Sequence, residues 1–171
     1  MLLVQRFTGL IENHAESLSK RWAEEVLSND LTAGYRSFSR QELHDIVFSR
    51  FRTLGEWLSR REGHDRELSL NFCKIGGERH AAGIKSSDMV YSFMIEREML
   101  MSYVQEEGII TEGIDLRRAL EFTAELSHFY DKAIYFALVG YEEAARKPDE
   151  RRSETELDKT FEGFGHWLIR E

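Results

Sequence analysis

The last long helical stretch, from about Ile114 to Lys147, constrains the fold of this chain more than any other feature. Between Ile114 and Lys147 there is no proline and only one glycine, Gly140, so this stretch predicts a single helix of about nine turns. Its apolar residues recur at spacings of three and four, which is the period of an α-helix, and they do so on two separate faces. A helix that is apolar on two faces needs two packing partners.

The two faces of this predicted helix differ in composition. The first face carries Leu116, Leu120, Thr123, Ser127, Tyr130, Ile134, Leu138, Tyr141 and Ala145. The second, more aromatic face carries Phe122, Leu126, Phe129, Ala133, Phe136 and Gly140. We expect the first face to line the core and the second to contact either another helix of the same chain or a second copy of the chain.

The rest of the sequence also has helical periodicity, and no segment alternates with the period of a strand. The expected helices span residues 2–28, 39–62, 65–82, 86–108 and 114–147, followed by an amphipathic segment at 157–168. Ser39 and Glu42 have the spacing of a capping box at the start of the second helix. Gly76 and Gly77 interrupt the third helix, where glycine is unfavourable, and therefore indicate a kink or a close helix contact. The pattern predicts an all-α fold, an antiparallel bundle of five to six helices.

Length and charge bound the domain count and the partners. With 171 residues the chain fits one domain, which we place at residues 1–147, with a linker and C-terminal amphipathic helix at 148–171. The net charge of −8 argues against nucleic acid and against an anionic membrane surface as partners. The single cysteine, Cys73, allows no intrachain disulfide, and the first residues do not resemble a secretion signal, so we expect a cytoplasmic protein.

Three polar side chains fall inside predicted apolar faces and are candidates for a ligand pocket: His14, Arg79 and Arg97. A buried arginine keeps its charge, so it must find an acceptor, extend its head to solvent or bind an anion. One interpretation is that each arginine pairs with a nearby carboxylate, for which Glu25, Glu78, Glu96 and Glu98 are available. The other is a pocket in which Arg79 and Arg97 bind a carboxylate or phosphate and His14 adds a donor.

Patterns for catalysis, metals and haem are weak in this chain. Glu125 and His128 have the spacing of a di-iron motif, but the sequence contains only one such motif, and the helical wheel puts both residues on a solvated face. His80 lies at the edge of an apolar face, and a lone histidine that binds haem has no short sequence signature. No motif surrounds Cys73 that would activate a thiol. We therefore expect no enzymatic activity, no metal site and no cofactor, and keep a haem- or anion-binding sensor and a helical metalloprotein as alternatives.

Several short segments between about residues 5 and 145 resemble one known family, the N-terminal domains of the RsbRD type, named for a co-antagonist of the kinase RsbT in the bacterial stressosome. The segments are Ile11-Glu12-Asn13-His14, Arg21-Trp22, Tyr35 through Glu42, Leu54-Gly55-Glu56-Trp57-Leu58, Gly77 through Ile84, Phe129-Tyr130-Asp131-Lys132-Ala133 and Gly140-Tyr141. The resemblance implies a helical, dimeric and non-catalytic sensory or regulatory input domain. It also implies that a globin-like arrangement without haem is one form the bundle can take.

The resemblance leads to a hypothesis about how the chain acts. We expect a homodimer formed through Phe122, Phe129, Ala133 and Phe136, whose packing shifts when a ligand or partner binds. Family members are usually fused to an output domain, whereas only a short helix is expected here after Lys147. The segment from Leu157 to Leu168 would then report the shift to a separate output or signalling protein.

Overall fold

Helices are the only regular secondary structure in the part of the chain that the structure describes. The computed structural model describes residues 4–59, 65–107 and 113–168. The elements are α1 (Val4–Asn13), α2 (Ala15–Ser28), the 3₁₀-helix η1 (Asp30–Ser37), α3 (Arg40–Arg52), α4 (Leu54–Ser59), α5 (Asp65–Ala81), α6 (Ser86–Glu107), α7 (Gly113–Ala145), the 3₁₀-helix η2 (Pro148–Glu150) and α8 (Glu154–Leu168). The all-α prediction is confirmed, and none of these helices is long and apolar enough to cross a bilayer.

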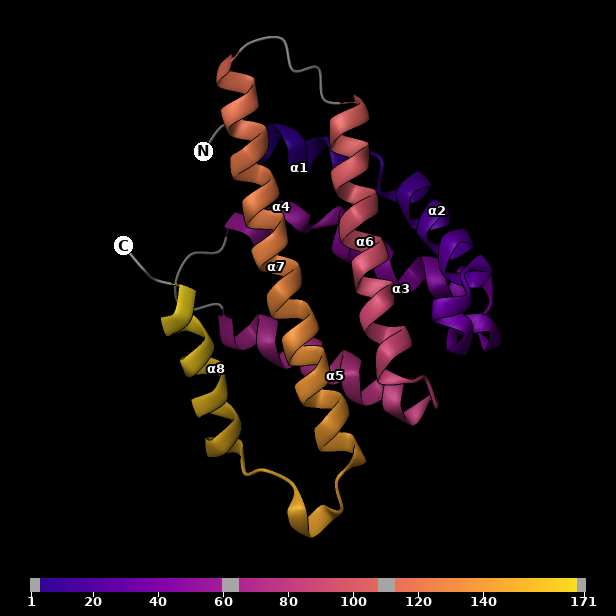
Figure 1. Cartoon of the computed structure of the whole chain (residues 1–171), viewed down its shortest axis with the longest axis vertical. Helices are drawn as coiled ribbons and strands as arrows, with labels where there is room; N and C mark the ends of the chain where they lie inside the picture. The colour runs from indigo at the N-terminus through magenta and orange to yellow at the C-terminus, as the bar shows by residue number, and fades with distance from the viewer. Residues whose placement is uncertain (1–3, 60–64, 108–112, 169–171) are drawn as a thin grey trace.

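The helices form a bundle in two crossing layers (Figure 1). In the front layer α6 and α7 run antiparallel and side by side. Helix α8 packs on α5 and lies beside the C-terminal half of α7, where Phe161 contacts Phe136. Behind them α1, α4 and α5 cross the direction of α7, while α2 and α3 pack together at the side of α6. The core lies between the two layers, where α5 and α7 make the most extensive contact.

Two of the predicted helices are broken in the structure, so the bundle has more and shorter helices than the expected five to six. The first helix breaks at His14, where the backbone N–H of His14 bonds to the Ile11 carbonyl and the ring Nδ1 lies 2.9 Å from the free Leu10 carbonyl. The second breaks at Thr53, whose hydroxyl donates to the Ser49 carbonyl at 2.9 Å. Neither break has a proline, and the helical spacing of apolar residues in the sequence continues across both. The sequence therefore gives no signal for these breaks.

The start of α3 lies where the capping box in the sequence predicts it. Ser39 and Glu42 form the predicted capping box, with the Glu42 N–H donating to the Ser39 hydroxyl at 3.2 Å and the Ser39 N–H donating to the Glu42 carboxylate at 2.7 Å. The same arrangement, which the sequence analysis missed, joins Ser153 and Glu156 at the start of α8.

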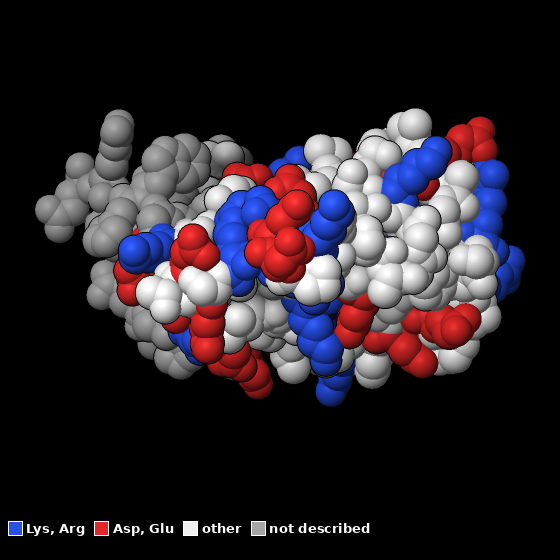
Figure 2. Space-filling model, turned by 90° about the horizontal axis from the view of Figure 1, so that it is seen from below, with Lys and Arg blue, Asp and Glu red and all other residues white. Residues whose placement is uncertain are grey.

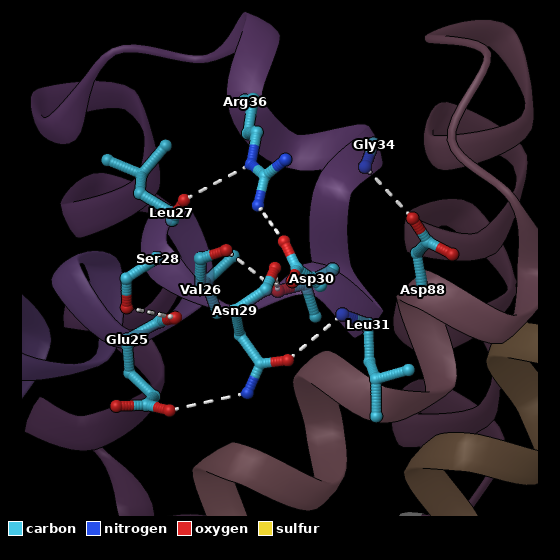
Figure 3. A network of polar contacts seen from close by, with 11 residues as sticks. Glu25, Val26, Leu27, Ser28, Asn29, Asp30, Leu31, Gly34, Arg36 and Asp88 are labelled. Carbon is cyan, nitrogen blue, oxygen red and sulfur yellow. Dashed lines mark hydrogen bonds and ion pairs between the residues drawn. The ribbon is translucent and has the colours of Figure 1, made fainter.

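The segment after α2, expected to be a loop, is the 3₁₀-helix η1, and polar side chains fix its position (Figure 3). Asn29 accepts a hydrogen bond from the Leu31 N–H at 2.9 Å, which caps the new helix. Asp88, from the first turn of α6, accepts the Gly34 N–H at 2.9 Å and so attaches η1 to the front layer. This contact places Tyr35 of η1 inside the core, where it is 1% exposed.

The aromatic face of α7 is buried within its own chain, so the prediction of a dimer contact through these residues is wrong. Phe122, Phe129, Ala133 and Phe136 are at most 4% exposed. Phe122 packs on Phe7 of α1 with ring centroids 5.4 Å apart. Phe129 packs on α5 and Phe136 on α8, through the rings of Phe72 and Phe161 at 5.8 and 5.3 Å. The chain supplies both packing partners of α7 itself.

The exposed apolar residues of α7 belong to the first of its two faces, the one that was expected to line the core. Leu116 is 52% and Leu120 is 63% exposed, whereas Tyr130 further along the same face is fully buried. Both leucines belong to the first turns of α7, whereas α8 runs beside the C-terminal part of this helix (Figure 1).

Glycine allows α5 and α7 to touch along their backbones. A Cβ atom on Gly76 would overlap the carbonyl of Ala137, and one on Gly140 would overlap the carbonyl of Cys73. The Gly76-Gly77 pair thus marks a close helix contact, one of the two outcomes that the sequence predicts. The second close approach is at Gly140, the glycine in the interior of the long helix.

The C-terminal helix α8 packs against the same core as the rest of the chain. Phe161 is 5% exposed and sits against Phe136, and Arg66 of α5 binds Asp158 and Glu154 of α8 at 2.9 and 3.2 Å. The predicted apolar contacts of Phe164, Trp167 and Leu168 fall on side chains outside those that the structure describes.

The close contact of α5 and α7 predicts a strong penalty for Gly76→Ala. The added methyl group overlaps rigid backbone, so we expect the free energy of unfolding to fall by about 3 kcal/mol in urea denaturation. Gly9→Ala is the matched control, because nothing lies within 4 Å of a Cβ at Gly9 and alanine favours a helix interior. Equal stability of the two variants would contradict the backbone contact.

Candidate functional site

A buried ion pair between Arg50 of α3 and Glu96 of α6 lies at the centre of the molecule. The Arg50 Nε and Nη2 groups donate to the two carboxylate oxygens of Glu96 at 3.0 and 2.7 Å, which is a bidentate geometry. Arg50 is 8% and Glu96 is 1% exposed. Burial lowers the pKa of Arg50, but the charge of Glu96, the hydrogen bonds to it and the nearby tyrosines together raise that pKa above its usual value, so the guanidinium keeps its charge.

Helices α5 and α7 complete the surroundings of this pair. Tyr130 of α7 donates its hydroxyl to Glu96 at 3.0 Å, and burial together with the charge of Glu96 raises the pKa of Tyr130 well above its usual value. The Arg50 guanidinium also lies over the rings of Phe72 and Phe93, 5.6 and 5.5 Å from their centroids. The pair therefore connects four helices and is fully hydrogen-bonded at the carboxylate.

Arg79 of α5 lines a cavity of about 320 Å³ between α3, α4 and α5. The cavity is lined by Ile46, Ser49, Arg50, Thr53, Trp57, Asn71, Phe72, Ile75, Glu78 and Arg79. Arg79 is only 7% exposed, and within the described residues no carboxylate or carbonyl accepts a hydrogen bond from it. Its nearest ionic partner is Glu78, with Nη1 and Oε2 4.0 Å apart, and Lys74 lies 3.9 Å from the same carboxylate.

Tyr35 of η1 closes one side of the Arg79 environment. The guanidinium lies 6.0 Å from the centroid of the Tyr35 ring. Burial raises the pKa of the Tyr35 hydroxyl, and the charge of Arg79 works against that rise. The Tyr35 hydroxyl itself lies 3.2 Å from that of Ser92, which donates to the Met89 carbonyl at 2.7 Å. Arg79 thus interacts with the ring and the hydroxyl of Tyr35 and with one carboxylate, that of Glu78, at 4.0 Å.

Arg97 lies apart from Arg79, in a surface groove of about 420 Å³ between α2 and α6. Its side chain is 29% exposed and its Nη1 lies 3.5 Å from the exposed carboxylate of Asp131. Arg21 and Glu25 line the same groove. Arg97 therefore pairs with a carboxylate as one interpretation expected, although with a partner that the sequence analysis did not consider.

His14 does not join either arginine. Its ring is exposed, bonds to its own helix at Leu10 and lies 5.7 Å from the ring of Tyr103. The three candidates that the sequence grouped into one pocket therefore occupy three separate places, and only Arg79 lies beside a cavity while being buried. The helix break at His14 turns its side chain away from the apolar stripe.

The residues weighed for metal, haem and thiol chemistry have ordinary environments. Glu125 and His128 are exposed on α7, as the wheel predicts. The His80 ring packs edge-on against Tyr141 at 5.0 Å. Burial raises the pKa of Cys73 to about 11, so its thiol is protonated. Within the described ranges no three His, Cys, Asp or Glu side chains are grouped closely enough to hold a metal ion.

The sequence analysis did not identify two buried residues with basic side chains, Arg50 and His44. Arg50 falls three residues after Val47 and four before Leu54, so it occupies a position of the apolar stripe, and this signal could have identified it. His44 of α3 is 9% exposed, with its ring nitrogens 2.9 Å from Asp45 and from Glu16 of α2. The hydrogen bond to Asp45, and then that to Glu16, raise the pKa of His44 against the effect of burial.

The molecular surface and the comparisons with known proteins add little to this picture. On the face shown in Figure 2, acidic and basic side chains are interspersed rather than separated into patches of one sign. Comparison with family models, curated proteins and solved structures finds no match to this chain. The Arg79 cavity and the neighbouring ion pair are therefore the features that bear on function.

The ion pair predicts unequal costs for removing two arginines. Arg50→Met leaves the Glu96 carboxylate buried without its partner, so we expect the free energy of unfolding to fall by about 3 kcal/mol. Arg97→Met is the control, because its pair with Asp131 is partly exposed and should contribute less than about 1 kcal/mol.

A double variant separates the charge from the packing at this site. Adding Glu96→Gln to Arg50→Met removes the unpaired charge while the amide oxygen still accepts from Tyr130, so we expect much of the lost stability to return. Urea denaturation measures all three variants. A single Arg50 variant as stable as the Arg97 variant would show that the pair does not hold these helices together.

Proposed function

We propose that this chain is a non-catalytic sensory or regulatory domain of a bacterial stress- or signal-transduction pathway, which binds a small ligand and acts through protein–protein interaction in the cytoplasm. One observation carries the proposal: the cavity beside Arg79 shares Arg50 with the ion pair that joins α3, α6 and α7. A ligand in that cavity would contact the residue on which the packing of three helices depends. Such an arrangement suits a change in helix packing better than a chemical reaction.

The resemblance to RsbRD-type N-terminal domains supports the same role. Its segment from Gly77 to Ile84 contains Arg79, and its segment from Phe129 to Ala133 contains Tyr130. Both residues belong to the buried polar region described above. The segments of the resemblance therefore include residues around the cavity as well as packing residues.

We further propose that the chain forms a homodimer, with a contact face different from the buried one that the sequence analysis favoured. The exposed leucines of α7, Leu116 and Leu120, border an apolar hollow of about 260 Å³ that Phe7, Met101 and Val104 also line. Large exposed apolar side chains grouped in this way are typical of interaction sites. A second copy of the chain is the partner that the resemblance implies, and a separate output protein would receive the signal.

Light scattering of two aspartate variants tests this proposal. We expect wild-type protein at twice the chain mass of 20.1 kDa, and Leu120→Asp at the mass of a single chain with an unchanged helical spectrum, because Leu120 is 63% exposed. Phe129→Asp is the contrasting variant, since it places a charge in the core and should unfold the protein. A wild-type monomer, or a Leu120 variant that remains dimeric, would refute the proposed interface.

A further inference from the structure

The Arg79 guanidinium has more hydrogen-bonding capacity than its surroundings use. It carries five N–H donors, yet the described residues offer it only the Tyr35 hydroxyl and the Glu78 carboxylate, the latter 4.0 Å away. Arg50, which lines the same cavity, is already satisfied by the bidentate contact with Glu96. The cavity therefore contains one buried positive charge that is available to an anion.

The lining of the cavity indicates what the part of a ligand outside its anionic group should be like. Ile46, Ile75 and the rings of Phe72 and Trp57 make an apolar lining. Asn71 lies at the other end of the α5 wall, eight residues or about 12 Å along the helix from Arg79. Its side-chain amide makes no hydrogen bond within the described part of the chain. The site thus has a cationic end, an apolar middle and a neutral polar end.

The net charge of the site favours a ligand with one negative charge over a ligand with two. Glu96 cancels the charge of Arg50, so an incoming anion meets one net positive charge from Arg79, with Glu78 at the rim. A dianionic phosphate would be under-compensated there, whereas a monoanionic carboxylate matches both the charge and the planar fork of the guanidinium.

We propose that the cavity between α3, α4 and α5 binds a small organic monocarboxylate, whose carboxylate pairs with Arg79 while its apolar body lies along Ile75 and Trp57. This inference deepens the proposed function by naming the class of ligand, and rests on it only for the role of the site in sensing. Binding itself depends on the geometry of the cavity alone.

Isothermal titration of the full chain with phenylacetate tests the site. We expect saturable binding, and affinities at least about tenfold weaker for phenylacetamide, which lacks the charge, and for inorganic phosphate. Equal affinity for phenylacetamide would show that Arg79 does not recognise the ligand, and preferential binding of phosphate would show a simple anion site. Absence of saturable phenylacetate binding would overturn the proposal.

Two variants of neighbouring residues should change the affinity in opposite directions. Arg79→Gln removes the charge and should weaken phenylacetate binding at least about tenfold, whereas Glu78→Gln removes the competing carboxylate and should strengthen it several-fold. Glu78 has a half-exposed side chain, so its variant is expected to fold normally. Arg97→Gln, in the separate groove, is the control and should bind as wild type.

A rim variant keeps the test decisive if Arg79→Gln does not fold. Ser49 is exposed at the edge of the cavity, so Ser49→Trp should fold and block entry, and it should abolish binding. Unchanged binding by both Glu78→Gln and Ser49→Trp would place the ligand elsewhere and overturn the proposal. If the protein binds phenylacetate but is a monomer in light scattering, the ligand site is supported and the proposed dimer is refuted.

Discussion

The backbone contact between α5 and α7 determines where the other parts of the structure lie. Gly76 meets the carbonyl of Ala137 and Gly140 meets that of Cys73, so the two helices approach more closely than side chains would allow. With that contact fixed, Phe72 of α5 packs on Phe129, and Arg79, three residues after Gly76, points into the cavity region beside α3. The aromatic face of α7 is covered as a consequence.

The buried charges complement this contact. Arg50 and Glu96 come from helices far apart in the sequence, and each has an apolar environment in which an unpaired charge would be very unfavourable. Their bidentate pairing, with Tyr130 as a third member, specifies one arrangement of α3, α6 and α7. Arg79 differs because its positive charge is buried without an equivalent acceptor, and this difference between two neighbouring arginines is the basis of the functional proposal.

The helices could be predicted from the sequence wherever a local signal exists. Ser39 and Glu42 cap α3 as expected, and the ends of α5, α6 and α7 lie within two residues of the predicted positions. The breaks at His14 and Thr53 could not be predicted, because neither has a proline. At His14 the ring bonds to the Leu10 carbonyl in place of the backbone N–H, and at Thr53 the hydroxyl adds a second bond to the Ser49 carbonyl that the backbone N–H also reaches. The identity of the surface against which the second face of α7 packs depends on tertiary structure, and the periodicity alone is the same for a dimer and for a single chain.

The candidate site was predicted only in part for a similar reason. The wheel of a single helix identifies a polar residue in an apolar stripe, as it did for Arg79, but does not show which partner faces it. Arg97 and His14 were grouped with Arg79 because each interrupts an apolar stripe. In the structure Arg79 lines the cavity between α3, α4 and α5, Arg97 lies in the groove between α2 and α6, and His14 bonds to its own helix. Glu96 appeared only as one available carboxylate, and its partner Arg50 became evident from the packing of α3 against α6.

The account depends on a division of roles between two arginines in one cavity, and side-chain NMR tests it most directly. The Nε–Hε signals of Arg79 and Arg50, assigned by substitution, can be followed while phenylacetate is added to the full chain. The account predicts that the Arg79 signal moves in a saturable manner, while the Arg50 signal shows at most a minor shift because Glu96 continues to accept its hydrogen bonds. Movement of the Arg50 signal with an unchanged Arg79 signal would contradict it.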